Sequence, residues 1–312
     1  MRNLVTGGAG FIGSHLVEAL AARGERVRVL DNFSTGRAEN LERVREQVDV
    51  LEGDVRDVAA LEAAMRGVEY VWHLAALVSV PDSIRDPRRY HEVNVDGTLS
   101  ILVAARKAGV RRVVFASSTA VYGLPTRLPT AEDHVTAPSS PYGLSKLVGE
   151  GYCQLFTRVY GLPTISLRYF NVFGPRQRAN SDYAGVIAKF VSRLVAGEPV
   201  VIYGDGHQSR DFIYVADIVR ANLAACEAKD ACGQVVNVGT GQGCKIRDLA
   251  ATLGELIGVR SQPTFAPERP GDVAHSLAAT ARAEEVLGFR ARTSLADGLA
   301  ATVAWYRERN PL

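Results

Sequence analysis

The stretch Thr6-Gly7-Gly8-Ala9-Gly10-Phe11-Ile12-Gly13 decides the fold. It lies between a short apolar run at residues 3–6, which predicts a β-strand, and a pattern at residues 12–22 that is typical of an α-helix. Glycine lets the backbone turn tightly and approach a pyrophosphate, while the N-terminus of the following helix offers N–H groups and a positive dipole end to the anion. The stretch therefore predicts a dinucleotide-binding strand–turn–helix unit.

Acidic residues after the next two strands indicate which dinucleotide is bound. Asp31 follows a predicted strand at residues 27–30 and lies 18 residues after Gly13. A carboxylate there accepts hydrogen bonds from the adenosine ribose and repels a 2′-phosphate, which favours NAD over NADP. The alternative is a plain turn with a surface aspartate. Asp54 follows a third strand, where it could accept from the adenine amino group with Val55 beside the ring; alone, it would more often be a solvated loop acid.

The rest of the first half alternates strand and helix patterns. Such alternation predicts an α/β fold of the Rossmann type, a doubly wound parallel sheet with helices on both faces. The predicted strands are 3–6, 27–30, 48–52, 68–74, 113–116 and 164–168, and the helices are 12–22, 58–65, 90–108 and 142–160. Turn signals become frequent after Gly174, so we expect an NAD-binding domain at 1–173 and a smaller substrate-binding lobe at 174–312. A strand at 235–238 is a candidate to return to the main sheet.

A second group of residues has the side chains needed for proton transfer. Tyr142 and Lys146 are four residues apart on a predicted helix, so their side chains share one face. An ammonium beside a phenol favours the phenolate, and it should lower a tyrosine pKa that is otherwise about 10. Ser118 follows the fifth predicted strand, and ligands collect at the carboxyl ends of such strands. These three residues predict a general acid–base site; without the glycine stretch, an amphipathic helix with an exposed lysine would be the better interpretation.

Composition excludes several classes of function. The 36 basic and 34 acidic residues give a net charge of +2, which provides no electrostatic case for nucleic acid or for an anionic membrane as partner. The four cysteines form no C-x-x-C pair and the histidines lack ligand spacing, so we expect buried thiols, no disulfide and no metal. We find no signal peptide and no run near the ~18 apolar residues of a membrane span, and we expect a cytoplasmic protein.

Taken together, these motifs resemble those of the extended short-chain dehydrogenases/reductases that act on nucleotide sugars, and most of all those of the UDP-sugar 4-epimerases. The resemblance covers nearly the whole chain. Its marks are residues 6–15, 31–36, 53–55, 73–76, 94–98, 117–123, Tyr142 with Lys146, and residues 168–177, 203–212 and 269–272. It implies epimerisation at C4 of a UDP-sugar by transient oxidation to a 4-keto sugar, with NAD as cofactor.

The resemblance also implies roles for matching positions. The catalytic residues would be Ser118, Tyr142 and Lys146. The cofactor-binding residues would be Gly7, Gly10, Phe11, Ile12, Asp31, Asn32, Ser34, Gly36, Asp54, Val55, Leu74, Ala75, Ala76, Asn94, Tyr142, Lys146 and Tyr169. The substrate-binding residues would be Ser79, Ser118, Tyr142, Asn171, Val186, Tyr203, Arg210, Arg269, Asp272 and Ser276. Surface salt bridging is the plainer interpretation of Arg210 and Arg269.

Related reactions and other sugars are the alternatives. Dehydratases and decarboxylases of this kind carry carboxylates near positions 119 and 120, where this chain has Thr119 and Ala120, which favours epimerisation. Ser276 falls where enzymes strict for glucose and galactose resemble one another in having a bulky tyrosine, so an N-acetyl group should fit here. UDP-glucuronate 4-epimerisation, dehydration and non-catalytic NAD sensing remain alternatives. The resemblance further implies a homodimer formed through the helices at 90–108 and 142–160.

Overall fold

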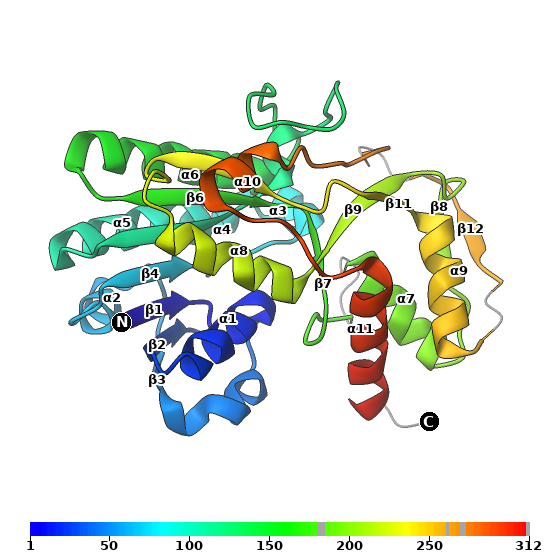
Figure 1. Cartoon of the computed structure of the whole chain (residues 1–312), viewed down its shortest axis with the longest axis horizontal. Coiled ribbons are helices and arrows are strands. Elements are labelled where there is room, and N and C mark those ends of the chain that lie inside the picture. Colours follow the sequence, from blue (N-terminus) through cyan, green and yellow to red (C-terminus); the bar gives the residue numbers. More distant parts are fainter. Residues whose placement is uncertain (180–184, 260–261, 269–272, 310–312) are drawn as a thin grey trace.

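The computed structural model describes residues 1–179, 185–259, 262–268 and 273–309. Its centre is a seven-stranded parallel sheet in the order β10-β6-β5-β4-β1-β2-β3. Figure 1 labels β6, β4, β1, β2 and β3 of this sheet in that order. The strands are β1 (Arg2–Thr6), β2 (Arg26–Asp31), β3 (Val48–Glu52), β4 (Tyr70–His73), β5 (Arg112–Ser118), β6 (Thr164–Tyr169) and β10 (Gln234–Val238). The strand order reverses between β1 and β4. In doubly wound folds, ligands bind in the crevice at the carboxyl ends of the strands where this reversal occurs.

Helices cover both faces of this sheet because successive strand residues point to opposite sides. Leu4 packs with α2 (Val58–Ala64), α5 (Gly97–Ala108) and α6 (Pro141–Tyr160). Val5 faces the other way and packs with α1 (Phe11–Ala22), α8 (Val215–Glu227) and α10 (Ala281–Leu287). The predicted Rossmann-type fold is confirmed: both strand faces are buried, as a parallel sheet between helical layers requires.

The helix predicted at 90–108 is three consecutive pieces. These are α4 (Pro87–His91), a π-helical segment at Glu92–Asp96, and α5. Single π-helical turns are rare and concentrate at functional sites. Here the wide turn carries Asn94, a predicted cofactor residue. The short helix α3 (Val80–Arg85) and the 3₁₀ segments Ala38–Gln47 and Thr119–Tyr122 complete this half of the molecule.

The second lobe has its own core and two small sheets. One is β11-β9-β7, made of Gly243–Lys245, Ser209–Tyr214 and Asn171–Phe173; the other is β12-β8, made of Thr264–Ala266 and Val201–Tyr203. Three helices pack around them, α7 (Val186–Val195), α9 (Ile246–Ile257) and α11 (Leu295–Arg309). The chain also crosses back, since β10 pairs with β6 in the main sheet. A single division at 173/174 stays a prediction.

The cysteines differ in exposure. All four are free thiols: Cys153 is buried, Cys226 and Cys244 are half-buried, and Cys232 is exposed. The prediction of buried thiols is therefore confirmed for Cys153 alone: it is wrong for Cys232, which lies in the turn before β10, and Cys226 and Cys244 are only partly covered. None of the helices in the described parts of the chain has the length and apolarity that crossing a lipid bilayer requires.

Candidate active site

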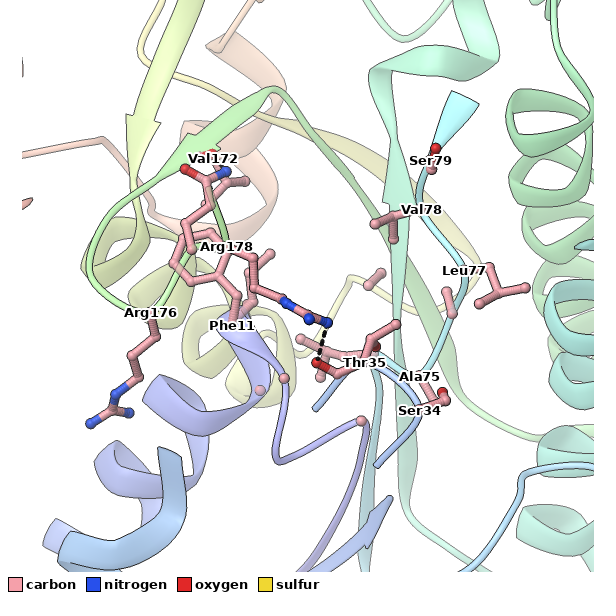
Figure 2. Close-up of a pocket in the computed structure, with 18 of the residues that line it drawn as sticks. Phe11, Ser34, Thr35, Ala75, Leu77, Val78, Ser79, Val172, Arg176 and Arg178 are labelled. Carbon is pink, nitrogen blue, oxygen red and sulfur yellow. Dashed lines mark hydrogen bonds between the residues drawn. The ribbon is translucent and has the colours of Figure 1, made fainter. Parts of the chain in front are cut away.

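A cavity of about 1540 Å³ opens at the carboxyl ends of the central strands, between the sheet and the second lobe. Pockets for one drug-sized ligand measure roughly 300–1,000 Å³, so this volume is enough for a dinucleotide and a second ligand together. The predicted site residues that line it are Gly7, Gly10, Phe11, Ile12, Asp31, Asn32, Ser34, Asp54, Val55, Leu74, Ala75, Ala76, Ser79, Ser118, Tyr142, Lys146 and Tyr169. Figure 2 shows part of this wall.

The glycine turn forms the floor of the cavity. Gly7 has a φ of +70°, and a side-chain Cβ there would lie 2.7 Å from the Ala75 nitrogen. Gly10 caps α1, and its N-terminal residues Phe11 and Ile12 line the cavity. A positive helix end therefore faces the space above a turn that only glycine can form. This cradle fits the pyrophosphate of a dinucleotide.

Two carboxylates lie at the far end of this floor. Asp31 accepts hydrogen bonds from the backbone N–H groups of Ala9 and Phe33 at 2.9 and 2.8 Å. Burial raises its pKa, and these hydrogen bonds oppose the shift. A Cβ at Gly36 would lie 2.9 Å from both Asp31 oxygens, so any larger residue at position 36 would clash with the carboxylate; Gly36 itself is not among the described residues of the cavity wall.

Asp54 is held by neighbours. Arg56 donates to its two oxygens at 2.8 and 2.9 Å, and the Asn32 amide donates to it at 2.9 Å. The Arg56 hydrogen bond holds the pKa of this carboxyl well below its usual range. Asp54 and Val55 both line the cavity. Asp54 therefore belongs to the cavity wall, although its sequence context alone is more typical of a solvated loop residue. Contact with adenine stays a prediction.

The catalytic candidates meet at the end of β5. Tyr142 lies in the first turn of α6, and the Ser118 side chain, at the end of β5, interacts with its phenol. The Lys146 ammonium donates to the Ala116 carbonyl at 2.8 Å. Burial raises the pKa of Tyr142 and lowers that of Lys146 to about 8. The expected lowering of the Tyr142 pKa is thus wrong here, because burial of the phenol outweighs the effect of the Ser118 side chain.

Asn94 supports the wall from behind. Its side-chain oxygen accepts the Leu77 N–H at 2.8 Å, and its amide nitrogen donates to the Leu77 carbonyl at 2.9 Å and to the Ser145 hydroxyl at 3.0 Å. Leu77 itself lines the cavity. In this arrangement Asn94 ties the loop after β4 to α6, and a direct contact with the cofactor stays a prediction.

The predicted substrate residues of the second lobe are less close to the cavity. Asn171, Val186, Tyr203, Arg210 and Ser276 are not among the described residues of its wall, and Arg269 and Asp272 lie outside the described residues. The Arg210 guanidinium donates to the carbonyls of Ser209 and Ala274, at 2.9 and 3.4 Å. The side-chain oxygen of Asn171 is buried and makes no hydrogen bond within the described parts of the chain.

Sequence reasoning missed a group of residues on the lobe side. Arg178 reaches from the lobe to the dinucleotide side and donates to the Thr35 carbonyl at 3.4 Å (Figure 2). Trp305 and Tyr306 of α11 also line the cavity, and the Tyr306 hydroxyl donates to the Gln177 carbonyl. Gln177 lies in a segment that carried the family resemblance and could have been found there. No local signal marks α11, which reaches the cavity through tertiary packing.

Comparison with known proteins identifies the family. The model of the NAD dependent epimerase/dehydratase family matches residues 3–239, so this chain belongs to that family. It is similar to the UDP-glucose 4-epimerase of Mycolicibacterium smegmatis, with 41% identity over 99% of this chain and 100% of that protein. The extended short-chain dehydrogenase/reductase resemblance is thereby confirmed, and NAD is the cofactor that the family and the glycine cradle share.

Solved structures agree. The UDP-glucose 4-epimerase of Thermotoga maritima, determined with UDP-glucose, matches with a TM-score of 0.95 and 42% identity over 99% of this chain and 100% of that one. The UDP-N-acetylglucosamine 4-epimerase of Methanobrevibacter ruminantium M1, in complex with UDP-N-acetylmuramic acid, matches with a TM-score of 0.95 and 41% identity over 99% and 98%.

Proposed function

We propose that this protein is an NAD-dependent isomerase that inverts C4 of a UDP-sugar, with UDP-glucose and UDP-galactose as substrates and their N-acetylhexosamine forms also accepted. The observation that carries the proposal is the meeting of Ser118, Tyr142 and Lys146 in one cavity with the dinucleotide cradle. The similar enzymes from Mycolicibacterium and Thermotoga support this substrate class.

The three residues divide the proton chemistry between them. Burial raises the pKa of Tyr142, so the phenolate that takes the proton of the C4 hydroxyl depends on the positive charge of Lys146, and Ser118 orients that hydroxyl and the phenol. Lys146 supplies positive charge that stabilises the phenolate formed when the proton returns to the sugar. When bound, NAD would supply the hydride acceptor for C4 and, after the flat 4-keto sugar has turned over, the hydride donor to its other face, with no net redox change. Return of the proton from Tyr142 to the same oxygen completes the epimer.

The segment after β5 argues against elimination of water. Loss of water or of a carboxyl group needs additional acid–base groups near the sugar. Thr119 and Ala120 occupy the positions where carboxylates would be expected, and the Ala120 N–H is used to donate to Ser118 at 3.1 Å. Epimerisation needs no further proton donor, because the same proton and hydride return to the same carbonyl group.

Ser276 supports the wider sugar range. It is buried beside β9, where its N–H donates to the Ser209 carbonyl at 3.0 Å, next to Arg210. A small side chain there leaves more room than a tyrosine would. The similar Methanobrevibacter enzyme is a UDP-N-acetylglucosamine 4-epimerase, which is consistent with an N-acetyl group being accepted.

The test is turnover of two substrates. The purified protein is incubated with UDP-galactose and, separately, with UDP-N-acetylgalactosamine plus trace NAD, and the anomeric protons are followed by NMR. We expect the matching gluco epimers of both without net NADH. Turnover of neither would contradict the neutral-sugar proposal and direct the test to UDP-glucuronate. Loss of water from the product would indicate a dehydratase.

We also propose a homodimer through α5 and α6. Val103 on α5 and Leu144, Val159 and Tyr160 on α6 are large apolar side chains that are 43–56% exposed. The Arg106 guanidinium lies 4.2 Å from the Tyr160 ring centroid, so the two exposed helix faces are continuous. Light scattering after gel filtration should give twice the 33.6 kDa chain mass, and Val159→Glu should reduce it to the chain mass.

A further inference from the structure

A buried ion pair lies directly behind the catalytic strand ends. Glu150 on α6 and Arg168 on β6 are 3% and 5% exposed. The Arg168 nitrogens donate to the two Glu150 oxygens at 2.9 and 2.7 Å. A buried pair of this kind has a large desolvation cost, so it is weak evidence for stability and invites the question of what else it does. Neither residue is among the described residues of the cavity wall.

Each member of this cluster is next to a site residue. The Ser117 hydroxyl donates to Glu150 at 2.5 Å, and Ser117 directly precedes Ser118 on β5. Arg168 directly precedes Tyr169, which lines the cavity. Glu150 follows Lys146 by four residues on α6, so the two side chains lie on the same helix face. One carboxylate therefore connects the serine strand, the lysine helix and the neighbouring strand.

Further contacts fix the guanidinium of Arg168. It donates to the Glu132 carbonyl at 3.3 Å, and its central carbon lies 4.7 Å from the centroid of the Tyr122 ring. The Tyr122 hydroxyl in turn donates to Asn237 of β10 at 2.7 Å. Because these partners come from separate elements, the ion pair has little freedom to move.

The surroundings of Lys146 contain few charges. Burial lowers its pKa to about 8, and Cys153 and Glu150 on its own helix oppose this. Burial raises the pKa of the Cys153 thiol to about 12, so that thiol is neutral at working pH. From β4, His73 faces the lysine, and burial lowers the His73 pKa to about 3, so it too is neutral. Glu150, which is paired with Arg168, is then the acidic side chain that opposes loss of the Lys146 proton.

The remaining neighbours of Lys146 do not titrate near neutral pH. On β5 the ammonium lies 5.1 Å from the Phe115 ring centroid and donates to the Ala116 carbonyl. Tyr142 on the same helix has a pKa raised by burial. The charged residue on β6 is Arg168, and its guanidinium forms an ion pair with Glu150, with 2.7 Å between the nitrogen and the carboxylate oxygen.

We propose that Glu150 and Arg168 form a positioning pair for the reaction: Glu150 anchors the end of β5 through Ser117, and so fixes Ser118, while it places a negative charge one helical turn from the Lys146 ammonium. The catalytic part of this inference rests on the proposed function. Its electrostatic part concerns the protein alone and can be tested without substrate.

The electrostatic test is a titration of Lys146. The chain has only five lysines, so labelling with [ε-¹³C]lysine gives few NMR signals, and loss of one signal in Lys146→Arg assigns it. Glu150→Gln keeps the shape of the side chain and removes its charge; we expect the Lys146 midpoint to fall from about 8. Glu150→Asp keeps the charge and should leave the midpoint near the wild-type value. Lys107, an exposed lysine paired with Glu62, is the internal control.

Two results would overturn the electrostatic part. They are an unchanged Lys146 midpoint in Glu150→Gln, or an equal fall in both variants, which would indicate a general disturbance of packing. Circular dichroism melting of each variant establishes that it is folded. If the enzyme turned over no UDP-sugar, this titration would still decide the question, so the two failures can be distinguished.

The positioning part is tested with Ser117→Ala, which removes one hydroxyl and leaves the ion pair intact. We expect kcat to fall several-fold with an unchanged KM for the UDP-sugar and an unchanged Lys146 midpoint, because Ser118 is less well held. Ser117→Thr, which keeps the hydroxyl, should recover most of the rate. Wild-type kcat in Ser117→Ala would contradict the anchoring role.

Discussion

The dinucleotide side and the lobe side of the cavity are built in different ways. On the dinucleotide side, the wall comes from the ends of parallel strands in one sheet. The glycine turn is fixed to the neighbouring strand β2, because the Gly7 N–H donates to the Leu30 carbonyl and the Ala9 N–H donates to the Asp31 carboxylate. On the lobe side, the wall comes from β7 and the loop after it, together with parts of α7 and α11. The first arrangement is rigid and suits a cofactor that stays; the second suits a substrate that must enter, turn and leave.

The comparison predicts that substitutions on the two sides have separable effects. Changes at the strand ends should alter chemistry or NAD binding, whereas changes in the lobe should alter the KM for the UDP-sugar. Four variants test this separation, and they are described from the largest expected effect to the smallest.

Tyr142→Phe should have the largest effect. It removes the proton acceptor while keeping the ring in its buried position, and general acid–base groups contribute about 10²- to 10⁴-fold, so we expect kcat to fall about 10³-fold. NAD content, measured by absorbance after release from denatured protein, should not change. A variant that keeps more than about a tenth of the activity would contradict the proton-transfer role.

Gly7→Ala compared with Gly109→Ala separates backbone strain from cofactor binding. The two glycines have φ angles of +70° and +67°, but a Cβ at Gly7 would meet Ala75 whereas one at Gly109 meets no atom of the described chain within 4 Å. Both changes should cost about 1–2 kcal/mol of stability through backbone strain, and Gly7→Ala should cost more because its Cβ also meets the Ala75 backbone. Only Gly7→Ala should also weaken the binding of NAD, and its Kd, measured by calorimetry, should rise about tenfold or more (~1.4 kcal/mol). Equal NAD affinity in the two variants would contradict the assignment of the Gly7 turn as the pyrophosphate-binding site.

Arg210→Ala tests the lobe side. If Arg210 contacts the nucleotide diphosphate, the loss of a charge-assisted hydrogen bond should raise the KM for the UDP-sugar about tenfold, with kcat and NAD content close to wild type. Steady-state kinetics at saturating NAD measure this. Loss of NAD in this variant would show that the two sides are not separable.

Ser276→Tyr should have the smallest and most selective effect. A bulky ring in this buried position should reduce kcat/KM for UDP-N-acetylgalactosamine at least about tenfold, while UDP-galactose changes little. The ratio of the two kcat/KM values is the readout, because it cancels any general loss of folded protein. Unchanged activity on the N-acetylated sugar would remove Ser276 from the specificity assignment.

How far the sequence sufficed differs along the chain. The spacing of Gly7, Gly10 and Gly13, with Asp31 after the next strand, was enough to predict the fold and NAD, because a short loop between a strand and a helix has few allowed conformations. The four-residue spacing of Tyr142 and Lys146 fixed their common face for the same local reason. Ser118 could be added because strands of a parallel sheet end at the same edge.

Other features depend on segments that are distant in sequence. The π-helical turn that carries Asn94 and the crossing of Arg178 to Thr35 have no local pattern, since each is held by partners from another part of the chain. The pKa of Tyr142 also could not be predicted, because it depends on burial beneath several elements rather than on the lysine four residues away.

The sequence by itself determined the class of fold and the cofactor and pointed to the candidate catalytic residues, because each depends on spacings within a single turn, strand or helix. Tertiary structure decided which side chains share the cavity with them. It brought α11 to the lobe wall and placed the Glu150–Arg168 pair behind Ser118 and Lys146. Burial and long-range packing set those contacts, and neither is a property of any short stretch of chain.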